Sequence, residues 1–177
     1  MKFWLGRVGS PIGTMLLVSD GEALRALDFS DHEARMRVLL RRYCGEFVLE
    51  AGAAGEAGRH LEDYFDGDLA APERIPVRTG GSDFQRRVWA ELRKIPAGAT
   101  SSYGRIAAAI GAPGASRAVG LANGANPVAI VVPCHRVIGA DGSLTGYGGG
   151  LKRKAWLLVH ERGDHSAAEL SEASTAT

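Results

Sequence analysis

The sequence predicts an α/β protein in two halves, a first half with a small sheet and a second half that is mostly helical. Short runs of β-forming residues, separated by turn residues, fill the first 30 positions. Farther along, apolar residues recur every three or four positions, which is typical of amphipathic helices. Residues 66–81 are rich in Gly, Pro and polar residues. We interpret them as the connection between the two halves.

The composition is that of an ordinary globular protein with little net charge. Hydrophobic residues make up 45% of the 177 positions, enough to bury a core. Lys and Arg total 21 against 20 Asp and Glu, a net charge of +1. This balance by itself does not indicate a nucleic-acid-binding protein, so any contact with DNA must come from a local patch.

The cysteine count and the apolar runs indicate the cellular compartment of the protein. Cys44 and Cys134 are the only cysteines in the sequence, so a disulfide framework is excluded and a reducing compartment is the simpler interpretation. The first residues hold no apolar run of the kind found in a signal peptide. No stretch approaches the length of a membrane span. We therefore expect a soluble, cytoplasmic protein.

The first half is expected to form strands and then helices. Strands are predicted at residues 3–5, 15–19 and 23–29, with Asp20-Gly21 as a hairpin turn between the last two. A helix that Asp31 caps is expected to run to about residue 43. A second amphipathic helix is expected at about residues 55–65.

The second half is expected to be helical around one apolar strand. A helix capped by Ser82 or Asp83 should end at Pro96, because Pro-Ala-Gly follows its apolar face. Further helices are predicted at about 102–110, 115–123 and 151–162, and an apolar strand at 128–132. The expected domains are residues 1–80 and 81–163, followed by a disordered tail at 164–177.

The two short helices at about 102–110 and 115–123, joined by a Gly-containing turn, have the pattern of a helix-turn-helix. The second is unusual for a helix that reads bases, because it is built mainly of Ala and Gly and its only charge is Arg117. A major-groove reader usually carries several polar side chains. A bare helix could approach a narrower groove closely. The alternative is that its small residues only pack it against a neighbour.

Cys134 is the candidate nucleophile. It follows the apolar run and Pro133, where the backbone becomes irregular. A thiol attacks as the thiolate and needs a base at neutral pH. His135 is adjacent, but neighbours on an extended chain point in opposite directions. Direct contact would therefore need a turn in the backbone, and a bridging water is a reasonable link. Glu161 is a candidate to orient His135. The alternatives are a Cys134 that is merely a small buried residue, as most free cysteines are, and a His135 that is merely a satisfied polar residue. For Cys44 the structural interpretation is preferred.

The residues around Cys134 resemble the active-site signature of a known family, the O6-alkylguanine-DNA alkyltransferases. The signature is the run Ile-Val-Val-Pro-Cys-His-Arg-Val-Ile-Gly at 130–139. Further matching motifs, in the same order, lie at 84–89, 95–98, 102–104, 117–127, 144–151 and 153–161. The resemblance is dense from about residue 82 to 161 and looser before, where Ser-Pro-Ile-Gly at 10–13 is similar to the opening of bacterial members.

The resemblance implies a two-lobed α/β fold. The N-terminal lobe would carry a small sheet of the ribonuclease H type with helices, and the C-terminal lobe would be helical and carry the helix-turn-helix. In this family the recognition helix enters the minor groove and the damaged nucleotide is rotated out of the duplex. The implied reaction is a single, irreversible transfer of an alkyl group from O6-alkylguanine, and also from O4-alkylthymine, to the protein.

The same resemblance assigns roles to individual residues. Cys134 matches the alkyl acceptor, His135 the base that acts through a water, and Glu161 the carboxylate that orients it. Asn126 matches the residue that ties the active-site turn to the neighbouring helix. Tyr103 matches the residue that promotes rotation of the nucleotide, and Arg117 matches the residue that intercalates in its place. The positions that match the lining of the guanine pocket are Val137, Tyr147, Gly148 and Lys154.

The resemblance also bears on cofactors and partners. No cofactor is implied, and no metal is expected. Some relatives carry a zinc module that senses methylated phosphates, but residues 1–43 contain no Cys, so this chain is of the bacterial type without it. A four-ligand zinc site is excluded because only Cys44 is spare. The expected partner is double-stranded DNA with O6-alkylguanine, bound by a monomer; cooperative assembly on DNA stays open.

Three alternative functions remain. The first is a non-enzymatic protein that binds alkyl lesions, which Cys134 argues against. The second is a Cys–His–Glu hydrolase, which would turn over, whereas an alkyltransferase stops after one event. The third is a plain helix-turn-helix regulator, which would need no cysteine and would prefer one DNA sequence.

Overall fold

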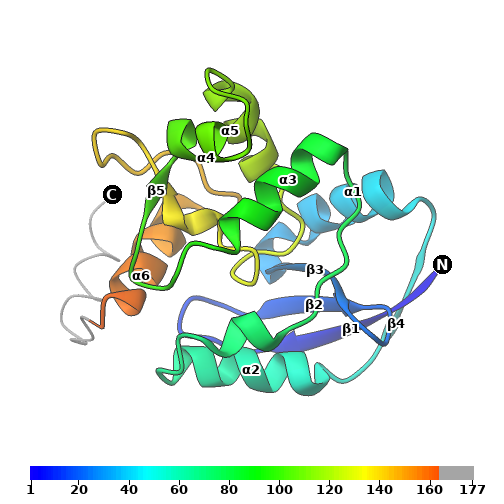
Figure 1. Cartoon of the computed structure of the whole chain (residues 1–177). Coiled ribbons are helices and arrows are strands. Elements are labelled where there is room, and N and C mark those ends of the chain that lie inside the picture. The colour runs from blue at the N-terminus through cyan, green and yellow to red at the C-terminus, as the bar shows by residue number, and fades with distance from the viewer. Residues whose placement is uncertain (164–177) are drawn as a thin grey trace.

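A four-stranded sheet forms the framework of the first half in the computed structural model, which describes residues 1–163 (Figure 1). Its strands are β1 (Lys2–Val8), β2 (Met15–Ser19), β3 (Leu24–Phe29) and β4 (Val48–Ala51), in the order β3-β2-β1-β4. The pairs β1–β2 and β2–β3 are antiparallel, and β4 runs parallel to β1. The three strands expected from the sequence are confirmed. The fourth was missed, because β4 is an edge strand whose four side chains are exposed or half-buried and lack an apolar alternation.

Helices α1 (Glu33–Cys44) and α2 (Gly55–Phe65) cover opposite faces of this sheet (Figure 1). The alternation of side chains along β2 explains the arrangement, since neighbouring residues of a strand face opposite ways. Leu16 belongs to the apolar cluster of α1, while Leu17 belongs to the larger cluster that contains Leu61 of α2. Both helices were expected, but the capping role of Asp31 was wrong. Asp31 lies in a short 3-10 helix, η1 (Ser30–His32), and its carboxylate pairs with Arg153.

Four further helices build the second half: α3 (Asp83–Leu92), α4 (Tyr103–Ala109), α5 (Ser116–Gly124) and α6 (Leu151–Glu161). Helix α3 begins with a capping box, in which the Ser82 hydroxyl accepts from Gln85 N and the Gln85 side chain accepts from Ser82 N. It ends at Leu92, four residues before Pro96, because residues 93–94 form a turn. The two-residue strands β5 (Ser101–Ser102) and β6 (Val137–Ile138) pair in parallel.

The expected strand at 128–132 was wrong. Val128 makes one isolated bridge to Leu27, and the chain then turns, with Ile130 at φ 68°. All five side chains are buried. An apolar run that is buried on every side has no periodicity, so its composition does not distinguish a strand from a buried turn.

One apolar cluster joins the two halves. It includes Met15, Leu27 and Leu61 from the first half and Trp89 and Leu157 from the second. The sheet and the helices around it confirm the α/β class. The domain boundary at residue 80 stays a prediction. The connecting segment contains a 3-10 helix, η2 (Ala71–Arg74), and is bonded to β3 through Leu24 N and Pro76 O, 2.9 Å apart. The expected tail at 164–177 lies outside the described residues, and within 1–163 no helix is long and apolar enough to cross a membrane.

Candidate active site

Cys134 lies at the end of a buried turn that two asparagines hold. Asn126 Oδ1 accepts from Val128 N at 3.0 Å, and Asn126 Nδ2 donates to Val132 O at 2.8 Å, so one side chain closes the turn. Asn123, in the last turn of α5, donates from Nδ2 to Cys134 O at 3.3 Å. Asn126 thus fixes the turn with its side chain, and its N–H donates to Asn123 O at 3.3 Å, so it also contacts the end of α5.

The Cys134 thiol is buried, with 5% of the residue exposed. Burial raises its pKa, because a thiolate loses its hydration there, and this outweighs the opposing effects of Asn126 and of the positive charges on Arg35 and Lys154. The resting sulfur is therefore a thiol at neutral pH. A nucleophile in this setting needs a base nearby, as the sequence suggested.

His135 lies in a 3-10 helix, η3 (Cys134–Arg136), so the backbone turns at this point instead of staying extended. Its side chain is fully buried, and Nε2 lies 2.7 Å from Glu161 Oε1. Burial lowers the pKa of His135 more than Glu161 raises it, so the imidazole is neutral. With an ionised Glu161, Nε2 carries the hydrogen and donates it. Nδ1 then has a free lone pair, and within residues 1–163 no partner meets that buried atom.

Glu161 is at the centre of a buried hydrogen-bond network. Arg136 Nε donates to Oε2 at 2.9 Å and Arg136 Nη2 to Oε1 at 2.8 Å. Tyr64, from α2, donates its hydroxyl to Oε1 at 2.8 Å. Burial alone would raise the pKa of Glu161, but the bonds from His135 and Arg136 hold it well below its ordinary value. The carboxylate is therefore ionised.

Arg136 and Tyr64 were missed as site residues. Arg136 stands in the signature next to His135, but its sequence position does not show that its guanidinium points to Glu161. Tyr64 follows the apolar pattern of α2 and lies 97 positions before Glu161. No local signal in the sequence separates such a tyrosine from an ordinary core residue.

Val137 and Lys154 hold the loop that follows the cysteine. Lys154 Nζ is buried and donates to Val137 O at 2.6 Å and to Thr145 O at 2.7 Å. Burial lowers its pKa. The lysine was expected near the pocket. Its ammonium group donates to the carbonyls of Val137, Thr145 and Gly146, so it anchors residues 137–146.

Tyr147 and Gly148 follow this loop, and Tyr147 lies close enough to Cys134 to be affected by its charge. Burial raises the pKa of Tyr147, and the negative charge of a Cys134 thiolate would raise it further. Its hydroxyl is buried, and no partner in the described part of the chain bonds to it. A Cβ added at Gly148 would lie 2.7 Å from Arg35 Cζ. A side chain in this position requires Arg35 to move, so glycine suits this chain.

Helices α4 and α5 present a face of small residues. Tyr103 begins α4, and its hydroxyl lies 3.0 Å from Thr145 Oγ1, so it contacts the anchored loop. Arg117 is exposed near the start of α5, and Ala118, Leu121 and Gly124 are exposed on the same helix. The structure thus places Tyr103 beside the loop that holds Tyr147, and Arg117 on the outer surface.

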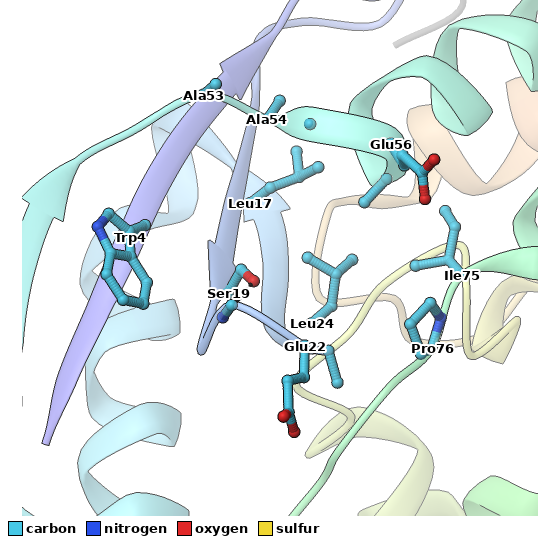
Figure 2. Close-up of a pocket in the computed structure, with 14 residues that line it drawn as sticks. Trp4, Leu17, Ser19, Glu22, Leu24, Ala53, Ala54, Glu56, Ile75 and Pro76 are labelled. Atoms are coloured by element: carbon cyan, nitrogen blue, oxygen red, sulfur yellow. Dashed lines mark hydrogen bonds between the residues drawn. The ribbon is translucent and has the colours of Figure 1, made fainter.

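A separate cavity of about 340 Å³ lies between the sheet and the start of α2 (Figure 2). Leu17, Leu24 and Ile75 form its apolar side, and Glu22 and Glu56 stand at its edge. None of the predicted site residues lines it. We therefore assign the chemistry to the Cys134 region. Within residues 1–163, no group of three His, Cys, Asp or Glu could hold a metal ion.

The fold and the site define a class: an α/β protein with a buried cysteine beside a His–Glu pair, next to two short helices with a bare outer face. Residues 83–163 match the family model for the DNA-binding domain of 6-O-methylguanine DNA methyltransferase. A methylated-DNA–protein-cysteine methyltransferase of Salmonella typhimurium is 48% identical over 159 residues, covering 88% of this chain and 93% of the relative. The chain belongs to the family of methylated-DNA–protein-cysteine methyltransferases, which are DNA-repair enzymes.

Other relatives agree. The methylated-DNA–protein-cysteine methyltransferase of Mycolicibacterium paratuberculosis is 61% identical over 121 residues, covering 68% of this chain and 70% of the relative. The crystal structure of Mycobacterium tuberculosis OGT in complex with DNA is similar with a TM-score of 0.80 and 44% identity, covering 96% of this chain and 98% of that chain. An archaeal O6-methylguanine-DNA methyltransferase from Pyrococcus kodakaraensis shares the fold, with a TM-score of 0.72 at 22% identity.

Proposed function

We propose that the chain repairs O6-alkylguanine in duplex DNA by moving the alkyl group, once and irreversibly, to Cys134 Sγ. The observation that carries this proposal is the buried thiol of Cys134 next to the neutral His135, whose other nitrogen is bonded to the ionised Glu161. Burial keeps the sulfur protonated at rest. The base beside it can generate the thiolate when the substrate is present.

The step balances as an in-line displacement. His135 Nδ1 takes the thiol proton through a water, and Cys134 Sγ forms a bond to the alkyl carbon. The C–O6 bond breaks, and its electron pair stays on the guanine oxygen. The backbone N–H of Gly148 is a donor of the kind that stabilises this charge. Guanine becomes neutral when it takes a proton from solvent, and His135 returns its extra proton to solvent. The product is a thioether, which cannot be deprotonated away, so each molecule acts once. O4-alkylthymine is a second substrate with the same leaving-group chemistry.

We further propose that α4 and α5 act as a helix-turn-helix whose second helix enters the minor groove. The exposed small residues of α5 support this, because they allow the helix axis to approach a narrow groove closely. Arg117 would stack in the gap left by a rotated nucleotide, and Tyr103 would promote the rotation. The solved complex of the M. tuberculosis relative with DNA makes duplex DNA the substrate to test. A ribonuclease H type for the sheet is proposed from its antiparallel β3-β2-β1 set, followed by α1 and the parallel β4.

Intact mass spectrometry after mixing with methylated duplex DNA tests the function. We expect one methyl group per protein, mapped to the peptide with Cys134, and no further gain with excess DNA. Cys134→Ser should bind the same DNA and stay unmodified, because the groove contacts lie on α4 and α5. A wild-type protein that binds the lesion without gaining mass would instead be a lesion-binding protein. Repeated release of product would indicate a hydrolase.

A further inference from the structure

We infer that Tyr64 is a positioning residue for the alkyl-transfer site, supplied by the first half of the chain. Its hydroxyl is the third donor on Glu161 Oε1, the same oxygen that accepts from His135 Nε2. The inference rests on the proposed role of His135 as the base, and it assigns to Tyr64 the control of how basic His135 is.

Helix α6 holds Tyr64 in place at both its backbone and its ring. His160 Nε2 donates to Tyr64 O at 2.7 Å, and the two rings meet edge to face with centroids 4.9 Å apart. Phe65, the next residue, packs on Trp156 with ring centroids 5.6 Å apart. The Tyr64 side chain is fully buried. The hydroxyl therefore has one orientation, directed at Glu161, and its hydrogen has no competing acceptor in bulk water.

Glu161 does not need Tyr64 in order to be ionised. Glu161 is ionised because Arg136 bonds to both of its oxygens. Tyr64 adds no charge, so its effect falls on the hydrogen bond that His135 shares with Oε1. Each donor on an oxygen reduces the negative charge left for the others. With three donors present, Oε1 pulls less strongly on the imidazole proton, and His135 Nδ1 is less basic.

The charged and titratable groups that face His135 come from three elements. Helix α6 contributes Glu161 and Lys154, η3 contributes Cys134 and Arg136, and α2 contributes Tyr64. Lys154 and Arg136 disfavour a second positive charge on the imidazole, and Glu161 favours it. Tyr64 weakens the one group that favours protonation. Its net effect is to keep His135 neutral and able to accept the thiol proton.

Tyr64→Phe removes the hydroxyl and keeps the ring. The rate of methyl transfer to Cys134 should then fall off at higher pH than in the wild type, with the midpoint of the acid limb raised on the order of one unit, the size expected for one lost bond to a buried charge. The plateau at high pH should stay within about threefold, because His135 is neutral there. Tyr43→Phe is the matched control: it also removes a bridging hydroxyl, which donates to Ala125 O at 3.2 Å, but that hydroxyl is not part of the Glu161 network, so its profile should match the wild type.

Two measurements separate this inference from a structural role and from the proposed function. A nitrogen-15 NMR titration of His135 in unreacted protein should show the same rise in pKa for Tyr64→Phe, even if the wild type were not alkylated at all. A 3-fluorotyrosine placed at position 64 keeps the ring and the bond but is a stronger donor, so its midpoint should move to lower pH. An equal loss of rate at every pH, or an unshifted His135 titration, would overturn the inference. A wild type that never gains an alkyl group would refute the function instead.

Discussion

At the residue scale, burial determines the chemistry of Cys134, His135 and Glu161. Desolvation favours the neutral thiol and the neutral imidazole, while hydrogen bonds from His135 and Arg136 overcome it for the carboxylate. The three groups therefore rest as thiol, neutral imidazole and carboxylate. In this set the proton is on the nucleophile and the base has a free lone pair. A transfer that begins only when the substrate arrives requires this arrangement.

The buried imidazole predicts that the protein loses stability in mild acid. The pKa of His135 in the fold is below its ordinary value of 6.5, so as pH falls the unfolded chain takes up this proton first. The free energy of unfolding should therefore drop as pH falls below 6.5, by about 1.4 kcal/mol for each unit by which the fold lowers the pKa. Glu161, with a lowered pKa, adds a further loss below its ordinary value of 4.5.

Urea denaturation between pH 4 and pH 8 measures this dependence, with His135→Gln as the comparison. The substitution removes the titrating group, so the loss between about pH 6.5 and pH 5 should shrink. A wild-type stability that is flat or rising toward pH 5 would contradict a neutral, buried His135.

At the scale of elements, α5 has two different faces. Its inner face contributes Asn123 to the turn of Cys134, and Val119 and Ala122 to the core. Its outer face is bare except for Arg117 and the exposed Leu121. A helix that both fixes the nucleophile and faces the DNA would place the sulfur at a set distance from the bound groove.

The proposed role of Arg117 predicts a difference between substrates. Arg117→Ala should slow transfer from methylated duplex DNA by tenfold or more, which corresponds to a rise of the activation free energy on the order of 1.4 kcal/mol. The reason is that the variant lacks the side chain that would fill the space left by the rotated nucleotide. Transfer from free O6-benzylguanine should hardly change, because no duplex has to be held open.

Single-turnover rates with the two substrates give the comparison, and Arg105→Ala provides a control, since Arg105 is an exposed arginine of α4. Equal losses on the duplex and the free base would count against a role for Arg117 in holding the nucleotide out.

At the scale of the whole molecule, side chains from the first half reach the site in the second. Tyr64 bonds to Glu161, and Arg35 donates from Nη1 to Asp28 at 2.7 Å and from Nη2 to Gly124 O at 2.6 Å. Arg35 thus connects β3 with the end of α5, next to the active-site turn. The halves are joined by polar contacts as well as by the common apolar cluster.

Removing this connection should destabilise the protein. Arg35→Met leaves the carboxylate of Asp28 without its partner, and Asp28 is 2% exposed. We expect a loss of about 1–3 kcal/mol, less than for a fully buried pair because Arg35 is partly exposed. Arg37→Met on the same helix breaks the exposed pair with Glu33, and should lose only about 0.5 kcal/mol. Urea denaturation of both variants measures the difference, and equal losses would refute the role of Arg35.

Local patterns predicted most of the elements but not the surroundings of the site. The strands β1 to β3 and the helices follow from turn residues and apolar spacing, and the signature at 130–139 located the cysteine. The buried turn at 128–132 was taken for a strand, because a run without polar positions has no period to interpret. The edge strand β4 was missed for the opposite reason, since its side chains are largely exposed.

The sequence by itself determined the family, and it singled out Cys134, His135 and Glu161 as the candidate nucleophile and its partners, because these lie in motifs that are close in the chain or fixed in order. Only the tertiary structure decided that Tyr64 and Arg35 reach the site, and that His135 is buried and neutral. The physical reason is that a hydrogen bond across 97 positions, and the desolvation of a side chain, depend on which surfaces pack together. No local pattern of residues records that packing.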